Sequence, residues 1–253
     1  MISSSYSAIF MLSQKLKQVD PSIRKLLLAG HHVLGYFTIF IAPNLLKRLE
    51  TNCRTLEDYV DLAFSFRIFP LLTIRPLQVK EEIIQLLKLL LKIRPNVACE
   101  IGTASGGTLF LLSKIANPNA IIISIDLPNG YPKYKIPFYK SFASQRQKIH
   151  LIQADSHDPF TIKAVKDILC DRKIDFLFVD GDHSYEGVKK DFQMYSKLVK
   201  HDGIMAFHDI VLHPPETGCE VNNFWLEVFD RYKTLEIIKD QDQKLGGIGI
   251  IFK

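Results

Sequence analysis

Hydrophobic and polar positions are most regular from residue 76 onward, where short apolar runs alternate with amphipathic stretches of helical length. The apolar runs predict strands at residues 97–100, 120–125, 149–153, 176–179, 203–207, 235–238 and 248–252. The amphipathic stretches predict helices at residues 79–93, 107–115, 159–170, 185–199 and 221–232. Strands that alternate with helices of this length are typical of a parallel sheet with helices on both faces.

The last two predicted strands, 235–238 and 248–252, are joined by a short polar stretch that contains glycine. A parallel connection needs a crossover of a dozen or more residues, usually a helix, and no helix fits here. We therefore expect these two strands to pair antiparallel. The predicted fold is α/β, with a seven-stranded, mostly parallel sheet whose last strand is antiparallel.

Residues 1–75 follow a different pattern, with apolar positions at helical spacing that are interrupted by proline and glycine. We predict a helical extension over 1–75 and a separate domain over 76–253. The apolar stretch 26–46 is long enough to cross a bilayer, but its histidines, glycines and proline disfavour a transmembrane helix. A cap over the active site is the preferred interpretation. A peripheral contact of residues 1–50 with a membrane or a partner stays open, and so does a homodimer, because the extension is apolar.

Charge and cysteine content narrow the classes of function. The net charge is +5, and residues 1–50 hold six lysines and arginines against two acids, so the rest of the chain is nearly neutral. A neutral domain has no basic surface for nucleic acid, and we expect no nucleic-acid partner. The four cysteines form no Cys-x-x-Cys pair, and no secretory signal stands out. Free thiols and a cytoplasmic location are expected, with membrane association left open.

A glycine-rich turn follows the first predicted strand of the domain and reads Glu100-Ile-Gly-Thr-Ala-Ser-Gly-Gly107. Ligands of open α/β sheets bind at the carboxyl ends of the strands, and glycine lets the backbone approach them closely. The spacing is not the Gly-x-Gly-x-x-Gly of dinucleotide sites, which counts against a nicotinamide oxidoreductase. An acid beside the turn suits a cationic amino group. The predicted contact residues are Glu100, Gly102, Thr103, Ser105 and Gly106.

Two further acids stand at predicted strand ends. Asp126 closes the second strand of the domain, about 20 residues beyond the turn, where a carboxylate accepts ribose hydroxyls in related folds. Asp155 follows the third strand and could accept the exocyclic amine of adenine. A role for Asp155 as a turn residue or helix cap is equally favoured.

Acids and histidines meet at the ends of the fourth and fifth strands, at Asp180-Gly-Asp-His183 and His208-Asp209. Neighbouring strand ends bring these groups together beside the predicted ligand. Asp180 and Asp209 suit a hard divalent cation such as Mg²⁺, with His208 as a third ligand. His183 has the chemistry of a general base for a substrate hydroxyl. A hydrogen-bonded polar cluster without metal is the alternative.

In this order, these motifs resemble the class I methyltransferases, which have a Rossmann-like fold. Within them, the chain is similar to small-molecule O-methyltransferases of the methyltransferase 24, cephalosporin-hydroxylase-like and macrolide-sugar type. The resemblance covers residues 76–253. It implies S-adenosylmethionine as cofactor, with Asp180 also near it, and methyl transfer to a small-molecule hydroxyl. Catechol-type relatives have an Asp-Asn pair and a lysine where this chain has His208-Asp209 and His183.

The sequence leaves the acceptor and one alternative function open. A sugar, a phenol or a natural-product intermediate is the acceptor that the resemblance implies. The alternative is a binding or scaffold protein that keeps the S-adenosylmethionine fold without catalysis. Intact Glu100, Gly102, Asp126 and His183 favour the enzyme.

Overall fold

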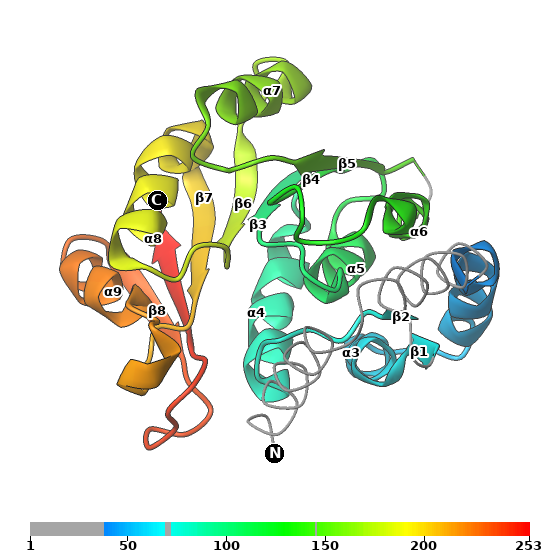
Figure 1. The fold of residues 1–253 in the computed structure, drawn as a ribbon, viewed down its shortest axis with the longest axis horizontal. Coiled ribbons are helices and arrows are strands. Elements are labelled where there is room, and N and C mark those ends of the chain that lie inside the picture. The colour runs from blue at the N-terminus through cyan, green and yellow to red at the C-terminus, as the bar shows by residue number, and fades with distance from the viewer. Residues whose placement is uncertain (1–37, 69–71, 145) are drawn as a thin grey trace, which may run out of the picture.

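The computed structural model describes residues 38–68, 72–144 and 146–253. Its central element is a seven-stranded sheet in the order β5-β4-β3-β6-β7-β9-β8 (Figure 1). The strands are β3 (Val97–Ile101), β4 (Ile121–Asp126), β5 (Lys148–Gln153), β6 (Ile174–Val179), β7 (Val199–His208), β8 (Lys233–Ile237) and β9 (Ile248–Phe252). The strands from β5 to β7 are parallel, and β9 runs antiparallel to both β7 and β8. The predicted α/β sheet and its reversed last strand are confirmed.

Helices cover both faces of this sheet and divide its core in two. Even-numbered positions such as Ala98 and Phe178 face one cluster, and odd-numbered positions such as Cys99 and Val179 face the other, as alternation along a strand requires. The first face carries α4 (Lys80–Ile93), α5 (Gly107–Ile115) and α6 (Ile136–Lys140). The second carries α7 (Pro159–Leu169), α8 (Tyr185–Tyr195) and α9 (Val221–Phe229).

Several predicted boundaries were wrong by a few residues. The helix expected to reach residue 199 ends at Tyr195 and continues as the 3-10 turn η2 (Ser196–Leu198), and β7 begins at Val199 rather than at 203. The helix expected over 159–170 ends at Leu169, because Cys170 adopts a left-handed conformation with φ 46°. The helix α6 and the 3-10 turn η1 (Lys133–Lys135) were missed, since they form from a stretch of only a few residues.

The described part of the N-terminal extension packs on the first helical face. It contains a helix over residues 38–50, α3 (Leu56–Ser65), and the two short paired strands β1 (Arg67–Ile68) and β2 (Leu72–Thr73). Its buried apolar residues belong to the same cluster as α4 and α5; they include Ile39, Ala42, Leu46, Val60 and Ala63. Among the described residues, no helix combines the length and apolar character needed to cross a membrane. Much of the predicted 26–46 segment lies outside the described residues.

Candidate active site

The glycine turn joins β3 to α5 and adopts backbone angles that side chains disfavour. Gly102 has φ 99°, and a Cβ there would lie 1.9 Å from the carbonyl oxygen of Asp180. Gly106 has φ 80°, and a Cβ on Gly107 would lie 2.4 Å from the carbonyl oxygen of Ile74. The glycines therefore let two other chain segments, one on each side, approach the turn closely.

Asp126 at the end of β4 binds the backbone of the same turn. Its Oδ2 accepts hydrogen bonds from the backbone amides of Thr103 (3.1 Å) and Ala104 (2.8 Å), and its Oδ1 accepts from Leu127 (2.8 Å). Each carboxylate oxygen can accept more than one hydrogen bond, so capacity for a ligand remains. The side chain thus lies where the sequence predicts, beside the turn, and its contact with a ribose stays a prediction.

Glu100 lies beneath the turn rather than in it. The side chain is fully buried, and its Oε1 accepts a hydrogen bond from Ser124 Oγ at 2.6 Å. Oε2 is buried and has no hydrogen-bond partner within the described part of the chain. Burial raises the pKa of this carboxyl to about 8. Its predicted contact with a cationic amino group stays untested, and the side chain does not line the pocket next to the turn.

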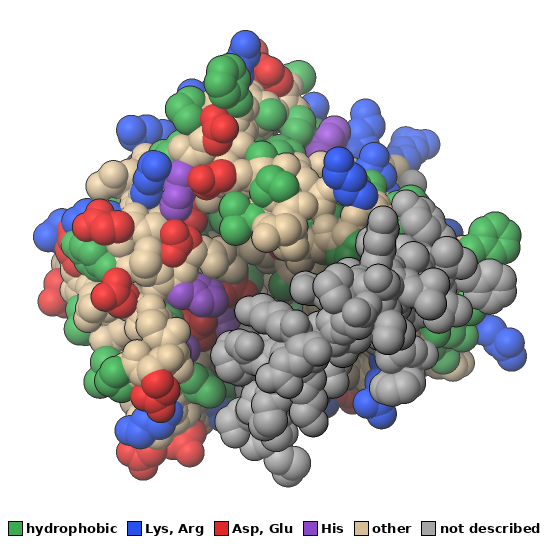
Figure 2. Space-filling model, in the orientation of Figure 1, with side chains coloured by type: hydrophobic (Ala, Val, Ile, Leu, Met, Phe, Trp, Pro, Cys, Tyr) green, Lys and Arg blue, Asp and Glu red, His purple; other side chains and the backbone are tan. Residues whose placement is uncertain are grey.

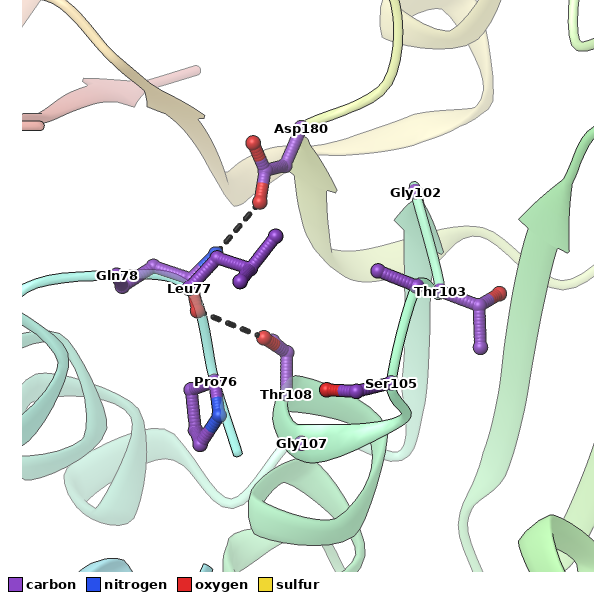
Figure 3. A pocket seen from close by; sticks show the side chains of 10 residues that line it. Pro76, Leu77, Gln78, Gly102, Thr103, Ser105, Gly107, Thr108 and Asp180 are labelled. Atoms are coloured by element: carbon purple, nitrogen blue, oxygen red, sulfur yellow. Dashed lines mark hydrogen bonds between the residues drawn. The ribbon is translucent and has the colours of Figure 1, made fainter. Parts of the chain in front are cut away.

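That pocket lies between the glycine turn, the end of β6 and the segment that leads into α4 (Figure 3). Gln78 crosses it: its Nε2 donates to Asp180 Oδ2 at 2.5 Å, and its Oε1 accepts from Thr108 Oγ1 at 3.1 Å. The predicted residues Gly102, Thr103 and Ser105 line it as well, together with Pro76, Leu77, Ala104 and Gly107. Sequence reasoning missed Gln78 and Thr108, because both lie outside the recognised motif and only folding brings Gln78 to the turn.

Asp180 connects this pocket to the acid–histidine cluster, which consists of Asp180, His183, His208 and Asp209. While Oδ2 of Asp180 faces Gln78, its Oδ1 lies 3.3 Å from His183 Nε2 and 3.1 Å from His208 Nδ1. Asp209 completes the cluster, with its carboxylate oxygens 3.7 Å from His183 Nε2 and 3.2 Å from His208 Nδ1. The structure therefore brings together all four residues that the sequence singled out at the ends of β6 and β7. Figure 2 shows histidine and acidic side chains near the middle of one face of the molecule.

The two histidines differ in exposure. The His183 side chain is 44% exposed, and its hydrogen bond with Asp180 raises its pKa. His208 is only 6% exposed; burial lowers its pKa, but the carboxylates of Asp180 and Asp209 outweigh burial and raise it. The cluster thus has one histidine that a substrate can reach and one that is enclosed.

Three residues of this cluster lie close enough together to be ligands of one metal ion. Asp180, His183 and Asp209 each offer a ligand atom within 4.8 Å of the other two. His208, the predicted third ligand, contacts both carboxylates through Nδ1, while its Nε2 is buried without a partner among the described residues. Its role as a ligand stays a prediction.

Asp155 follows β5 and is used by a turn. Its Oδ1 accepts a hydrogen bond from the amide of His157 at 2.8 Å, and its side chain is 59% exposed. This is the turn role that the sequence favoured equally. The contact with adenine stays untested.

The chain is similar to known methyltransferases in sequence and fold. Residues 99–210 match the family model described as a methyltransferase domain, and these residues span β3 to the end of β7, including the glycine turn and the acid–histidine cluster. This match and the seven-stranded sheet with its reversed last strand give the chain a Rossmann-like fold similar to that of methyltransferases. The resemblance expected from the sequence is thereby confirmed.

Uncharacterized protein R132 of Acanthamoeba polyphaga mimivirus is 35% identical over 116 residues, which are 44% of this chain and 49% of that protein. The match thus spans about half the length of this relative.

Solved structures of methyltransferases share the fold of this domain. The O-methyltransferase TomG of Streptomyces achromogenes, which is involved in tomaymycin synthesis and was solved with SAM, has a TM-score of 0.53 and 15% identity. That match covers 83% of this chain and 96% of TomG. An O-methyltransferase of Bacillus cereus in complex with SAH has a TM-score of 0.51 and 12% identity, covering 85% and 100% of the two chains.

Proposed function

We propose that the protein is an S-adenosylmethionine-dependent methyltransferase that methylates a hydroxyl oxygen of a small molecule. The observation that carries the proposal is the position of Asp180. One of its oxygens faces the pocket beside the glycine turn, and the other contacts His183. Asp180 thus places a pocket for the cofactor close to a group that can accept a proton, and methyl transfer to a hydroxyl oxygen needs both in proximity.

In the proposed complex, the glycine pocket would receive the amino-acid end of S-adenosylmethionine. The pocket is small, and the backbone of the glycine turn lines it together with polar side chains. Thr108 Oγ1 and the amide of Gln78 are polar groups placed to bind that end. The nucleoside would extend toward Asp126, whose carboxylate would accept the ribose hydroxyls. S-adenosylmethionine would supply an electrophilic methyl group on a sulfonium.

His183 would act as the general base. The acceptor hydroxyl must lose its proton when the oxygen attacks, and an imidazole beside carboxylates is a suitable proton acceptor. Asp180 and Asp209 hold the ring through Nε2. Because the side chain is 44% exposed, an acceptor can reach it. The two carboxylates would stabilise the imidazolium that forms.

A divalent cation fits the same cluster. Two carboxylates and an imidazole within 4.8 Å form a donor set suited to such an ion. Asp180 and Asp209 would hold it with the predicted ligand His208, which contacts both carboxylates, and His183 would stay free to accept the proton. When bound, it would lower the pKa of the acceptor hydroxyl.

The N-terminal extension would act as a cap next to the cofactor. The end of the extension lies against the glycine turn, where the hydroxyl of Ser105 donates to the carbonyl oxygen of Arg75 at 2.5 Å. Lys114 on α5 pairs with Glu50 at 3.1 Å, and both side chains are largely buried, which fixes the extension to the domain. Homodimer formation and a membrane or partner contact through residues 1–50 stay predictions, and residues 1–37 lie outside the described part.

Calorimetry with S-adenosylhomocysteine tests cofactor binding, and transfer of labelled methyl from S-adenosylmethionine to a panel of sugars, phenols and catechols tests catalysis. The enzyme is supported if S-adenosylhomocysteine binds and one acceptor is methylated in a His183-dependent manner. Binding without transfer to any acceptor favours the non-catalytic scaffold. The absence of binding would overturn both functions.

A further inference from the structure

Three side chains of different ligand chemistry meet on the loop that follows β7. Asp209, His213 and Cys219 each offer a ligand atom within 4.8 Å of the other two. Asp209 and His213 are buried, and Cys219 is partly buried. The match to the methyltransferase family ends at residue 210, so His213 and Cys219 lie beyond it.

The backbone holds this loop independently of the three side chains. The amide of Glu220 donates to the carbonyl oxygen of His183 at 2.8 Å, and the amide of Cys219 donates to Thr217 Oγ1 at 3.2 Å. Asp209 adopts a left-handed conformation with φ 64°, which aspartate tolerates better than most residues. The three groups are therefore preorganised before any ligand binds.

The spacing of Asp209 and His213 is compatible with a shared metal ion. Asp209 Oδ1 lies 3.3 Å from His213 Nε2, a distance that an ion pair and two ligands of one ion both allow. Two ligands bonded at about 2.0–2.1 Å to a tetrahedral ion lie about 3.3–3.4 Å apart. The amide of Gly246 lies 3.2 Å from His213 Nε2 and donates to it when the imidazole is neutral, which is the form that binds a metal ion. Metal binding would replace that hydrogen bond.

We propose that Asp209, His213 and Cys219 form a zinc site. Thiolate, imidazole and carboxylate are the ligands that Zn²⁺ takes in proteins, whereas Mg²⁺ prefers oxygen alone. Binding requires the thiol of Cys219 to lose its proton to solvent as the sulfur–zinc bond forms. Three protein ligands leave the fourth tetrahedral position for water or for an oxygen of a bound molecule.

The site shares Asp209 with the acid–histidine cluster. Oδ1 of Asp209 lies 3.3 Å from His213 Nε2 and 3.2 Å from His208 Nδ1, and Oδ2 lies 3.7 Å from His183 Nε2. A zinc ion on the His213 side would draw negative charge away from His183 and fix the loop between β7 and α9. The zinc site does not depend on methyl transfer, because its ligands are intact whatever the domain catalyses.

Cobalt provides the probe, because Co²⁺ replaces Zn²⁺ and absorbs in the near ultraviolet only when a thiolate binds it. The full chain, reduced and freed of metal, is titrated with Co²⁺. We expect one equivalent to give thiolate–cobalt absorption, which Zn²⁺ then abolishes by displacement. Cys219→Ser and His213→Asn should lose the absorption. Cys170→Ser is the matched control, since Cys170 is an exposed free thiol elsewhere on the surface, and it should keep the absorption.

Cys219→Asp separates loss of the ligand from loss of folding. This variant should still bind Co²⁺, which is detected by the visible absorption of the bound ion, but the near-ultraviolet thiolate absorption should be absent. Absence of the absorption in the unmodified chain, its persistence in Cys219→Ser, or its loss in Cys170→Ser would overturn the site. S-adenosylhomocysteine affinity is measured on the same samples, so a failed zinc site with intact cofactor binding is distinguished from a failed methyltransferase.

Discussion

The two halves of the candidate site, at the ends of β3 and β4 and at the ends of β6 and β7, differ in the groups that form them. At the ends of β3 and β4, backbone atoms predominate: glycines admit neighbouring segments, and Asp126 accepts three backbone amides. At the ends of β6 and β7, titratable side chains contact one another, with Asp180 between two histidines. The first half depends on shape and the second on charge. Substitutions should therefore affect the two halves in different ways, the first through folding and cofactor affinity and the second through turnover.

The largest effect is expected in the backbone-built half, for Gly102→Ala. The added Cβ would lie 1.9 Å from the carbonyl oxygen of Asp180, in a backbone conformation with φ 99°. Because neither backbone segment can move without disrupting the sheet, we expect a loss of about 3 kcal/mol or more in the free energy of unfolding. S-adenosylhomocysteine binding should be lost as well.

Gly218→Ala is the matched control for this change. Gly218 also has positive φ (66°), but a Cβ there has no atom of the described chain within 4 Å. Only the conformational cost of about 1 kcal/mol should remain. Thermal unfolding of both variants measures the difference, and equal melting temperatures for the two would contradict the close approach of Asp180 to the turn.

His183→Ala tests the side-chain half. Loss of a general base typically slows a reaction by about 10²–10⁴-fold, so kcat should fall by that factor. The affinity for S-adenosylhomocysteine should stay within about twofold, because Asp180 and not His183 lines the pocket. His201→Ala, at the opposite end of β7 and exposed, is the control and should leave both quantities unchanged. Unchanged kcat in His183→Ala would remove the base from the proposed function.

Glu100→Gln tests whether the buried carboxyl beneath the glycine turn makes stability depend on pH. The folded-state pKa of Glu100 is about 8, against an ordinary value of 4.5, because burial disfavours the charge. Between these two values the folded state holds a proton that the unfolded state has released, so stability falls as pH rises through this window. We expect wild type to lose on the order of a few kcal/mol from this group between about pH 4.5 and 8.

The readout for Glu100→Gln is the difference in slope between the two proteins. Other titrating groups are common to both, so denaturant unfolding at a series of pH values isolates the contribution of residue 100. Stability of the variant should depend less on pH. Parallel curves would show that Glu100 is ionised within the fold.

Sequence reasoning succeeded where a pattern is local. The glycine turn and β9 are readable because each depends on residues close together in the chain. The cluster around Asp180 could also be predicted, but this needed the expected sheet as well as the local motifs. Neighbouring parallel strands end at the same edge of a sheet, and this brings the motifs together. Gln78 could not be predicted, because its contact with Asp180 joins residues 102 positions apart through the packing of α4. His213 and Cys219 were missed for a related reason: their loop follows no periodic pattern, and only its folded path brings them to Asp209.

Asp126→Asn should produce the smallest effect. It shows whether the negative charge of Asp126 contributes to cofactor affinity in the backbone-built half. The carboxylate accepts amides from Thr103, Ala104 and Leu127, and an amide side chain has only one oxygen with which to accept them. Hydrogen bonds to a charged group are worth about 1.5–3 kcal/mol, so S-adenosylhomocysteine affinity should fall by about 10- to 150-fold. Asp158→Asn is the control, because Asp158 also accepts a backbone amide, that of Phe160, at the start of α7, and asparagine is an equally good helix cap. Calorimetry should find its affinity unchanged. If both variants bind as wild type does, Asp126 only shapes the turn and the ribose contact is wrong.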